Sequence, residues 1–330
     1  MEKSPTSVLC HRILGEYYLV LDEYENAVDT SRNGRKLVSA ESQRTGLTYQ
    51  KYNTQTPEDV LPLADVCRNQ DALTVTLATA LIHFQAPKHH AEARSHFETA
   101  LKHNPSSGGA LVGLGLILEE QGDYSGAADS LNKALLKDPE NVRVMSEAAW
   151  CHVLQGHYAI GQQRLENCLE KVTGIDPRSR DLKAQILWRI GTCMWNADGT
   201  IAIALCIIAT NGIFFLTEES RKDRKGPYHY FIAALQSNHN FAPAYTSLGC
   251  FYADIMNDTP RANKCFQRAF EISAGEVEAA ERLARSFAES REWELVEIIA
   301  RRVAEADKIR SIPGKGLHWP QSAIGVVELV

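Results

Sequence analysis

The sequence predicts an all-α solenoid, in which antiparallel helix pairs stack side by side into a right-handed superhelix. Residues 74–107 and 108–141 carry the same pattern of small, bulky and proline residues, 34 positions apart, and similar copies follow toward the C-terminus. Apolar residues make up 44% of the 330-residue chain and charged residues 23%, which is typical of a folded globular protein.

Residues 108–141 define the pattern best. Gly115, Ala127, Leu131, Ala134 and Pro139 stand at positions 8, 20, 24, 27 and 32 of the unit, a spacing typical of the tetratricopeptide repeat. Small residues at positions 8, 20 and 27 let two helices approach closely, and the proline ends the second helix. One such hairpin cannot bury its apolar face alone, so neighbouring hairpins must stack.

Template matching along the chain yields about seven helix pairs and divides it into five parts. These are an N-terminal helical repeat and connector (1–73), a tandem tetratricopeptide array (74–175), a repeat interrupted by an apolar insert at 199–217 (176–241), a tandem pair (242–310) and the start of a truncated further repeat (311–330).

Three segments depart from the pattern. Residues 42–73 contain Thr56-Pro57 and Leu61-Pro62 and predict short helices or a connector. Residues 173–180 predict a turn followed by a helix start after Pro177. The first helix of the interrupted repeat is expected at Leu187–Trp195.

The third departure is the apolar stretch Ile201–Leu216, which falls where a short polar turn belongs. Three interpretations compete: a buried extra helix or strand, a membrane segment, or non-native sequence such as a translated intron. A bilayer crossing needs about 20 residues, and both flanks fit one soluble array. The sequence therefore favours the non-native interpretation, and a transcript that encodes the stretch would contradict it.

No catalytic, cofactor-binding or metal-ligating motif is recognisable, so we expect a protein that is not an enzyme. His96 and His103 could share a helix face, but no further metal ligands follow at close spacing. The eight cysteines show no C-x-x-C pair and predict reduced thiols in a cytoplasmic, or also nuclear, protein. A net charge of −6 argues against a dedicated duplex-binding module.

Residues at positions 2, 5, 9, 12 and 13 of the first helices are expected to line a concave groove. The groove is mixed to acidic, and chaperone-type carboxylate clamps are not expected, because Val112 and Leu116 stand where Lys and Asn would be needed. Candidate partner-contact residues are Glu119, Glu120, Trp150, Glu278, Arg285 and Trp319, although packing between repeats is the better explanation of both tryptophans.

Several stretches go beyond a generic repeat, among them VLCHRILGEYY, FAPAYTSLGCFYAD and HWPQSAIGVVEL. They resemble the tetratricopeptide scaffold subunit of the fungal superkiller complex, over nearly the whole chain except Gly199–Thr217. The family protein is much longer, so the chain resembles an internal fragment of it.

The resemblance implies a scaffold without catalytic residues. It would hold a DExH-box RNA helicase and a WD-repeat protein, and would assist 3′-to-5′ mRNA decay by the cytoplasmic exosome. Contact with RNA would be at most indirect, and no membrane is involved. The alternative is a tetratricopeptide adaptor of another assembly, chaperone-linked or transport. A third interpretation is a repeat protein anchored in a membrane by Ile201–Leu216.

Overall fold

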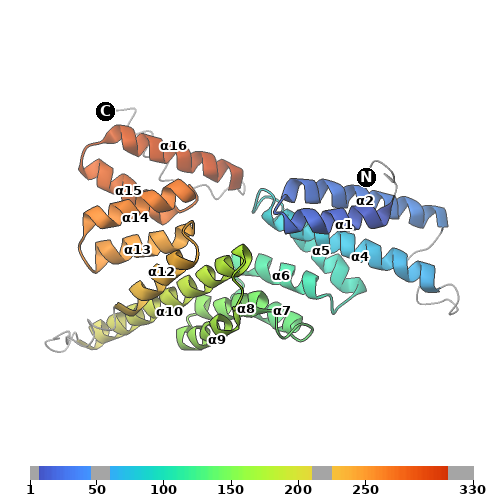
Figure 1. Ribbon diagram of the computed structural model, residues 1–330, viewed down its shortest axis with the longest axis horizontal. Coiled ribbons are helices and arrows are strands. Elements are labelled where there is room, and N and C mark those ends of the chain that lie inside the picture. The colour runs from blue at the N-terminus through green and yellow to red at the C-terminus, as the bar shows by residue number, and fades with distance from the viewer. Residues whose placement is uncertain (1–6, 46–59, 210–224, 311–330) are drawn as a thin grey trace. The chain divides into compact units, whose positions relative to one another are not determined.

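The structure, a computed structural model, describes residues 7–45, 60–209 and 225–310, and these contain fourteen helices and no strand (Figure 1). The helices form two compact units, Met1–Pro139 and Glu140–Val330, referred to below as unit 1 and unit 2. The all-α repeat fold expected from the sequence is confirmed. The boundary between the units falls inside the array predicted for 74–175, and the five-part division stays a prediction.

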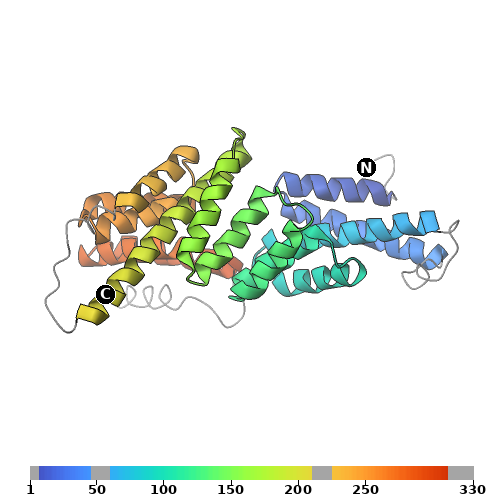
Figure 2. The same ribbon diagram turned by 90° about the horizontal axis from the view of Figure 1, so that it is seen from below.

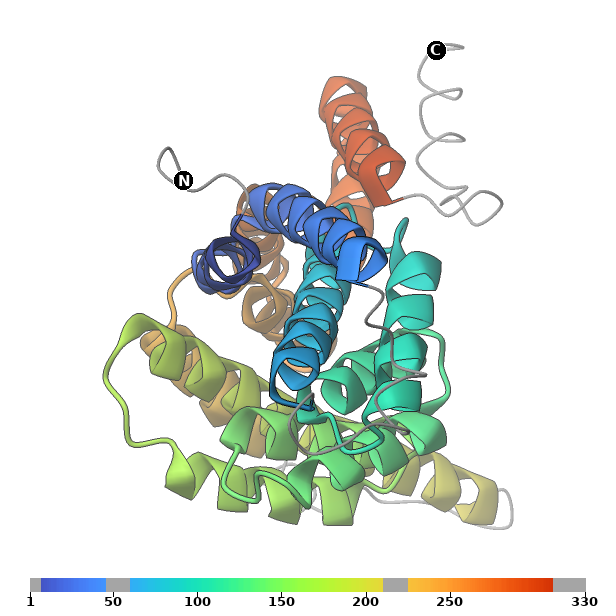
Figure 3. The same cartoon turned by 90° about the vertical axis from the view of Figure 1, so that its right-hand side faces the viewer.

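Unit 1 consists of three helical hairpins. Its helices are α1 (Val8–Val20), α2 (Tyr24–Thr45), α4 (Val60–His83), α5 (His90–His103), α6 (Gly108–Glu120) and α7 (Tyr124–Leu135). The two helices of each hairpin pack on each other, and each hairpin also contacts the next through α2 on α4 and α5 on α6. Figure 3 shows α1 and α2, in blue, lying side by side.

Unit 2 continues the same scheme with four hairpins. Its helices are α8 (Val142–Leu154), α9 (Tyr158–Lys171), α10 (Pro177–Ala209), α12 (Lys225–Ser237), α13 (Ala242–Asp254), α14 (Thr259–Ile272), α15 (Val277–Glu289) and α16 (Trp293–Arg310). The first helices of successive hairpins also contact each other, α8 with α10, α10 with α13, and α13 with α15. The described residues thus contain the seven helix pairs that the period predicts.

Short polar signals place the helix ends. Asp123 accepts a hydrogen bond from the Gly126 N–H at 2.9 Å and caps α7, and Asn141 caps α8 through the Val144 N–H at 3.2 Å. Two hairpins turn at a glycine in the left-handed region, Gly122 at φ 83° and Gly156 at φ 84°. Glycine adopts this conformation without a Cβ clash, which permits a tight reversal between antiparallel helices.

Small residues at position 8 allow the two helices of a hairpin to approach closely. A Cβ on Gly115 in α6 would lie 2.8 Å from Leu131 Cγ in α7. In unit 2, a Cβ on Gly249 in α13 would lie 2.5 Å from Phe266 Cε1 in α14. The sequence-based explanation of this position is therefore confirmed in both units.

One difference from the sequence analysis concerns residues 42–73. Helix α2 extends to Thr45, and α4 begins at Val60 and continues without a break to His83. Pro62 does not break α4 because it is the third residue of the helix, where the backbone N–H needs no intrahelical partner. Residues 60–73 are therefore helical, whereas Thr56-Pro57 lies outside the described residues.

A second difference concerns the interrupted repeat. Helix α10 begins at Pro177, as predicted, but it continues past Trp195 to Ala209, for 33 residues (Figure 2). The residues after Trp195 include Ala197, Ala202 and Ala204, which favour helix, and no proline; Gly199 is the residue that opposes helix most strongly. The first part of the insert thus prolongs the helix. Residues 210–224, and the side chains of 198–209, lie outside the described part of the chain.

Candidate protein-interaction surfaces

The two acidic candidates in unit 1 lie at the end of α6. Glu120 Oε2 accepts a hydrogen bond from His90 Nδ1 of α5 at 2.8 Å, and His90 Nε2 lies 2.9 Å from the Ile82 carbonyl oxygen. The bond to Glu120, more than that to Ile82, raises the pKa of His90, although burial opposes it. The bond between His90 and Glu120 thus links the hairpin of α4 and α5 to the hairpin of α6 and α7. The Glu120 side chain remains 54% exposed. Glu119 is half-buried.

In unit 2, Trp150 lies among aromatic and charged side chains of successive first helices. Its ring centroid is 5.5 Å from that of Trp188 in α10, and the guanidinium carbon of Arg189 is 5.2 Å from it. Arg189 is buried and forms an ion pair with Glu147 of α8 at 2.5 Å. Trp150 therefore packs between hairpins, as the sequence analysis favoured, and it is half-buried.

Glu278 and Arg285 both lie on the exposed surface of α15. Glu278 accepts from Arg282 at 2.8 Å, and Arg282 also pairs with Asp254 of α13 at 2.8 Å, so the pKa of Arg282 is raised. Arg285 pairs only weakly, with Glu281 one turn earlier, and its side chain is 64% exposed. It therefore has a guanidinium that a partner could reach.

The candidate residues are divided between the two units. Glu119 and Glu120 belong to unit 1, whereas Trp150, Glu278 and Arg285 belong to unit 2, and Trp319 lies outside the described residues. Their role in partner contact stays a prediction.

An apolar stripe on α1 was not singled out by the sequence analysis. Four side chains about one turn apart, each between 46% and 54% exposed, form this α1 stripe: Leu9, Ile13 and Tyr17 of the helix, and Leu21, its C-cap. The opposite side of α1 contacts α2 and α4. The signal for the stripe in the sequence is the apolar residues at positions 9, 13, 17 and 21, which recur at helical spacing on the outer face of the helix.

Repeat register shows what this stripe corresponds to. With Gly15 at position 8, Ile13 and Tyr17 occupy positions 6 and 10. In α13, position 10 is Phe251, which is 4% exposed and packs on Tyr228 of the preceding hairpin with centroids 5.2 Å apart. In α6, position 10 is Ile117, which is fully buried in the core that includes Phe97 of the preceding hairpin. The α1 stripe is therefore a stacking face that no other helix of unit 1 covers in the described residues.

The described residues hold no group of three or more His, Cys, Asp or Glu side chains that could bind a metal ion. Cys10, Cys151, Cys168, Cys193, Cys250 and Cys265 are all free thiols. None of the helices in the described ranges combines the length and the apolar character needed to cross a bilayer. The part of Ile201–Leu216 beyond Ala209 lies outside those ranges.

Comparison with known proteins supports the repeat and a specific relationship. Two family models described as tetratricopeptide repeat match residues 77–142 and 118–186. Superkiller protein 3 of Schizosaccharomyces pombe is 32% identical over 99% of this chain, which corresponds to 21% of that protein. Superkiller protein 3 of Saccharomyces cerevisiae is 26% identical over 99% of the chain and 20% of that protein. The chain thus spans about a fifth of the length of these relatives.

Solved structures of low sequence identity share the fold. A tetratricopeptide repeat protein from Parabacteroides merdae has a TM-score of 0.54 at 15% identity, covering 94% of this chain and 98% of that one. A chain of the Cut9–Hcn1 assembly has a TM-score of 0.51 at 13% identity, covering 98% of this chain and 53% of that one. The chain is therefore built from tetratricopeptide repeats. It is homologous to superkiller protein 3 over 99% of its own residues, which correspond to 21% of that protein.

Proposed function

We propose that this chain is part of a non-catalytic scaffold of the superkiller complex. In this role it holds a DExH-box RNA helicase and a WD-repeat subunit, and assists 3′-to-5′ mRNA decay by the exosome in the cytoplasm. The observation that carries the proposal is the similarity to superkiller protein 3 over 99% of the chain. In this proposal the helicase contacts the RNA, and this chain contacts RNA at most indirectly.

The architecture supports a scaffold. Stacked hairpins offer extended surfaces on which partners bind, rather than one enclosed pocket. The polar groups of α15 are arranged in surface ion pairs, which stabilise by about 0–1 kcal/mol each and are easily exchanged for partner contacts. The α1 stripe adds an apolar face suited to a further helical element.

The alternative is a tetratricopeptide adaptor of another assembly. BBSome complex member bbs-4 of Caenorhabditis elegans is 28% identical over 44% of the chain, a shorter match than those to superkiller protein 3. A chaperone-linked adaptor is disfavoured, because Ser146, at the position of a clamp cation, is buried and accepts a hydrogen bond from Arg189 at 3.0 Å.

Co-purification tests the proposal. The tagged protein is isolated from its native cells at mild salt, and the proteins bound to it are identified by mass spectrometry. Recovery of the helicase and the WD-repeat subunit is expected. Recovery of neither, or of a different set of partners, contradicts the superkiller assignment and favours the alternative.

A matched pair of variants tests the partner-contact residues. Arg285→Ala removes an exposed guanidinium of a first helix, whereas Arg301→Ala removes one of similar exposure and pairing on the second helix α16. We expect Arg285→Ala to reduce recovery of at least one partner and Arg301→Ala to leave it unchanged. Equal recovery with both would remove Arg285 from the interface.

A further inference from the structure

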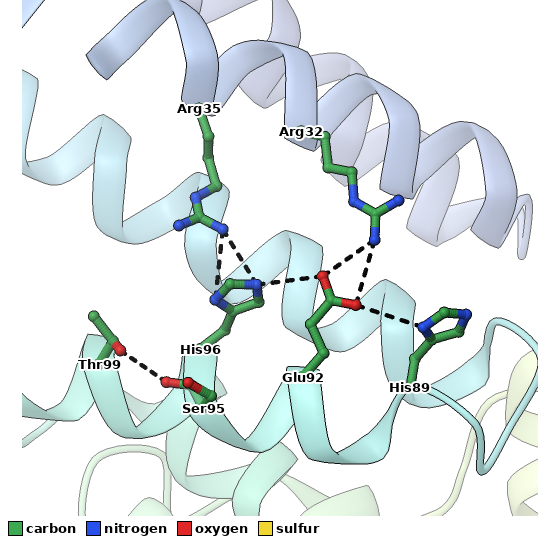
Figure 4. A network of polar contacts seen from close by, with 7 residues as sticks. All are labelled: Arg32, Arg35, His89, Glu92, Ser95, His96 and Thr99. Carbon is green, nitrogen blue, oxygen red and sulfur yellow. Dashed lines mark hydrogen bonds and ion pairs between the residues drawn. The ribbon is translucent and has the colours of Figure 1, made fainter.

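A group of basic side chains from two second helices of unit 1 surrounds a single carboxylate (Figure 4). Glu92 of α5 lies 3.1 Å from Arg32 Nη2 of α2, 3.5 Å from His89 Nδ1 and 3.7 Å from His96 Nε2. Arg35 of α2 approaches His96 from the other side, with its Nη1 3.3 Å from Nε2 and 3.5 Å from Nδ1. These five residues are called the α2–α5 basic cluster below.

The charges of the cluster do not balance. Glu92 already faces Arg32, and Arg35 forms no ion pair with a carboxylate among the described residues. Burial lowers the pKa of Arg35, and burial together with Arg35 lowers the pKa of His96. Glu92 offsets both effects in part, but Arg32 already pairs with this carboxylate, so two guanidiniums share a single negative charge.

Packing does not require this arrangement. The contact between Arg32 and Glu92 already links α2 to α5, and Arg35 adds a second cation without a second anion. His89, the N-cap of α5, makes no side-chain cap hydrogen bond, so the positive end of the helix dipole lies beside His89 and Glu92 at the start of the cluster. Both features favour a negatively charged ligand.

We infer that the α2–α5 basic cluster binds a phosphorylated side chain of a partner protein, with Arg35, Arg32 and His96 as the contacting residues. A phosphate monoester has about two negative charges and three acceptor oxygens, so one group can accept from both guanidiniums and from the imidazole. The side chains of Arg32 and His96 are 43% and 19% exposed, and a ligand can therefore reach them from solvent.

The size of the cluster favours a single phosphate over a nucleic acid strand. Binding of RNA requires a basic track that follows several phosphates, whereas here the cations gather around one carboxylate and the chain carries a net charge of −6. The inference does not depend on which complex the chain belongs to.

A titration tests the site on the full chain. The probe is a synthetic peptide, Gly-Ser-Gly-phosphoserine-Gly-Ser-Gly, added at constant ionic strength while the imidazole resonances of His96 are followed by NMR. His96→Gln assigns these resonances. We expect a saturable change at His96, and we expect Arg35→Gln to weaken binding by about tenfold or more. Arg32→Gln, which removes the second contacting guanidinium, is also expected to weaken binding.

The matched control is Arg94→Gln, because Arg94 also lies on α5 but pairs with Glu98 and Gln121 instead. It is expected to leave binding unchanged, and circular dichroism confirms that all variants are folded. A response of equal size to the unphosphorylated peptide, or to a peptide with Glu in place of phosphoserine, overturns the inference. Oligouridylate binding that depends on Arg35 and is not displaced by the phosphopeptide overturns it in favour of RNA.

Discussion

At the scale of single residues, glycine sets the distance between neighbouring helices. Gly113 and Gly115 lie two positions apart on α6 and serve different contacts. Gly115 faces α7 within its own hairpin, and Gly113 faces the ring of Phe97 on α5 of the preceding one. Phe97 is fully buried, so its ring cannot move aside without disturbing its neighbours.

This contact predicts the effect of a matched pair of substitutions on α6. Gly113→Val places a side chain inside the van der Waals envelope of Phe97, and overpacking of this kind costs about 1–3 kcal/mol. Gly108→Val adds the same side chain at a position with no atom within 4 Å of the new Cβ. Thermal unfolding followed by circular dichroism should show a lower Tm for Gly113→Val alone, and equal Tm values would contradict the packing described.

His90 leads to a prediction about pH. Its pKa lies above the ordinary value of 6.5 because Glu120 holds the protonated ring. A raised folded-state pKa means that the stabilisation is fully present below the ordinary value and is lost as pH rises through the raised one. We therefore expect the Tm advantage of the wild type over Glu120→Gln to be largest at mildly acidic pH, about 5 to 6, and to shrink toward alkaline pH.

The matched control for this prediction is Glu98→Gln, because Glu98 pairs with Arg94 and not with a histidine. Its Tm difference from the wild type should not change over the range in which His90 titrates. NMR titration of the His90 ring measures the cause directly, and an unchanged His90 pKa in Glu120→Gln would disprove the explanation.

At the scale of elements, the hairpin formed by α10 and α12 is stabilised by the part of α10 that precedes the apolar insert. Gly191 lies against Phe231, and a Cβ on Gly226 would lie 2.6 Å from Met194. Leu187 and Ala234 belong to one buried cluster. These contacts all involve residues 187–194 of α10, so they do not depend on residues 199–217.

Deletion of residues 199–217 is therefore expected to leave the Tm and the packing of this hairpin unchanged. Phe231→Ala is the control that shows the assay reports on the hairpin, since loss of this buried ring should cost about 3–5 kcal/mol. The two variants are compared by thermal unfolding. A deletion as damaging as Phe231→Ala would mean that the segment supports the fold, and would argue against its being non-native.

At the scale of the whole molecule, the features that the sequence predicts are those that repeat. The seven helix pairs can be predicted from residues at fixed repeat positions, such as Gly115 and Phe266, because the repeat period can be recognised in the amino-acid sequence itself. The lengths of α4 and α10 could not be predicted from the repeat pattern. Its positions describe the residues that pack inside a hairpin and do not indicate where a helix ends. The α2–α5 basic cluster could not be predicted either, because Arg35 and His96 are 61 residues apart and meet only after two hairpins stack.

The ion pair between Glu147 and Arg189 constrains how this chain can change over evolutionary time. Both side chains are almost inaccessible to solvent, and they come from different hairpins, 42 residues apart. Replacing only one of the two residues leaves the other as an unpaired buried charge, which lowers the free energy of unfolding by about 3–5 kcal/mol. Across descendants of a common ancestor, these two positions should therefore be inherited together or replaced together, and single exchanges should be rare.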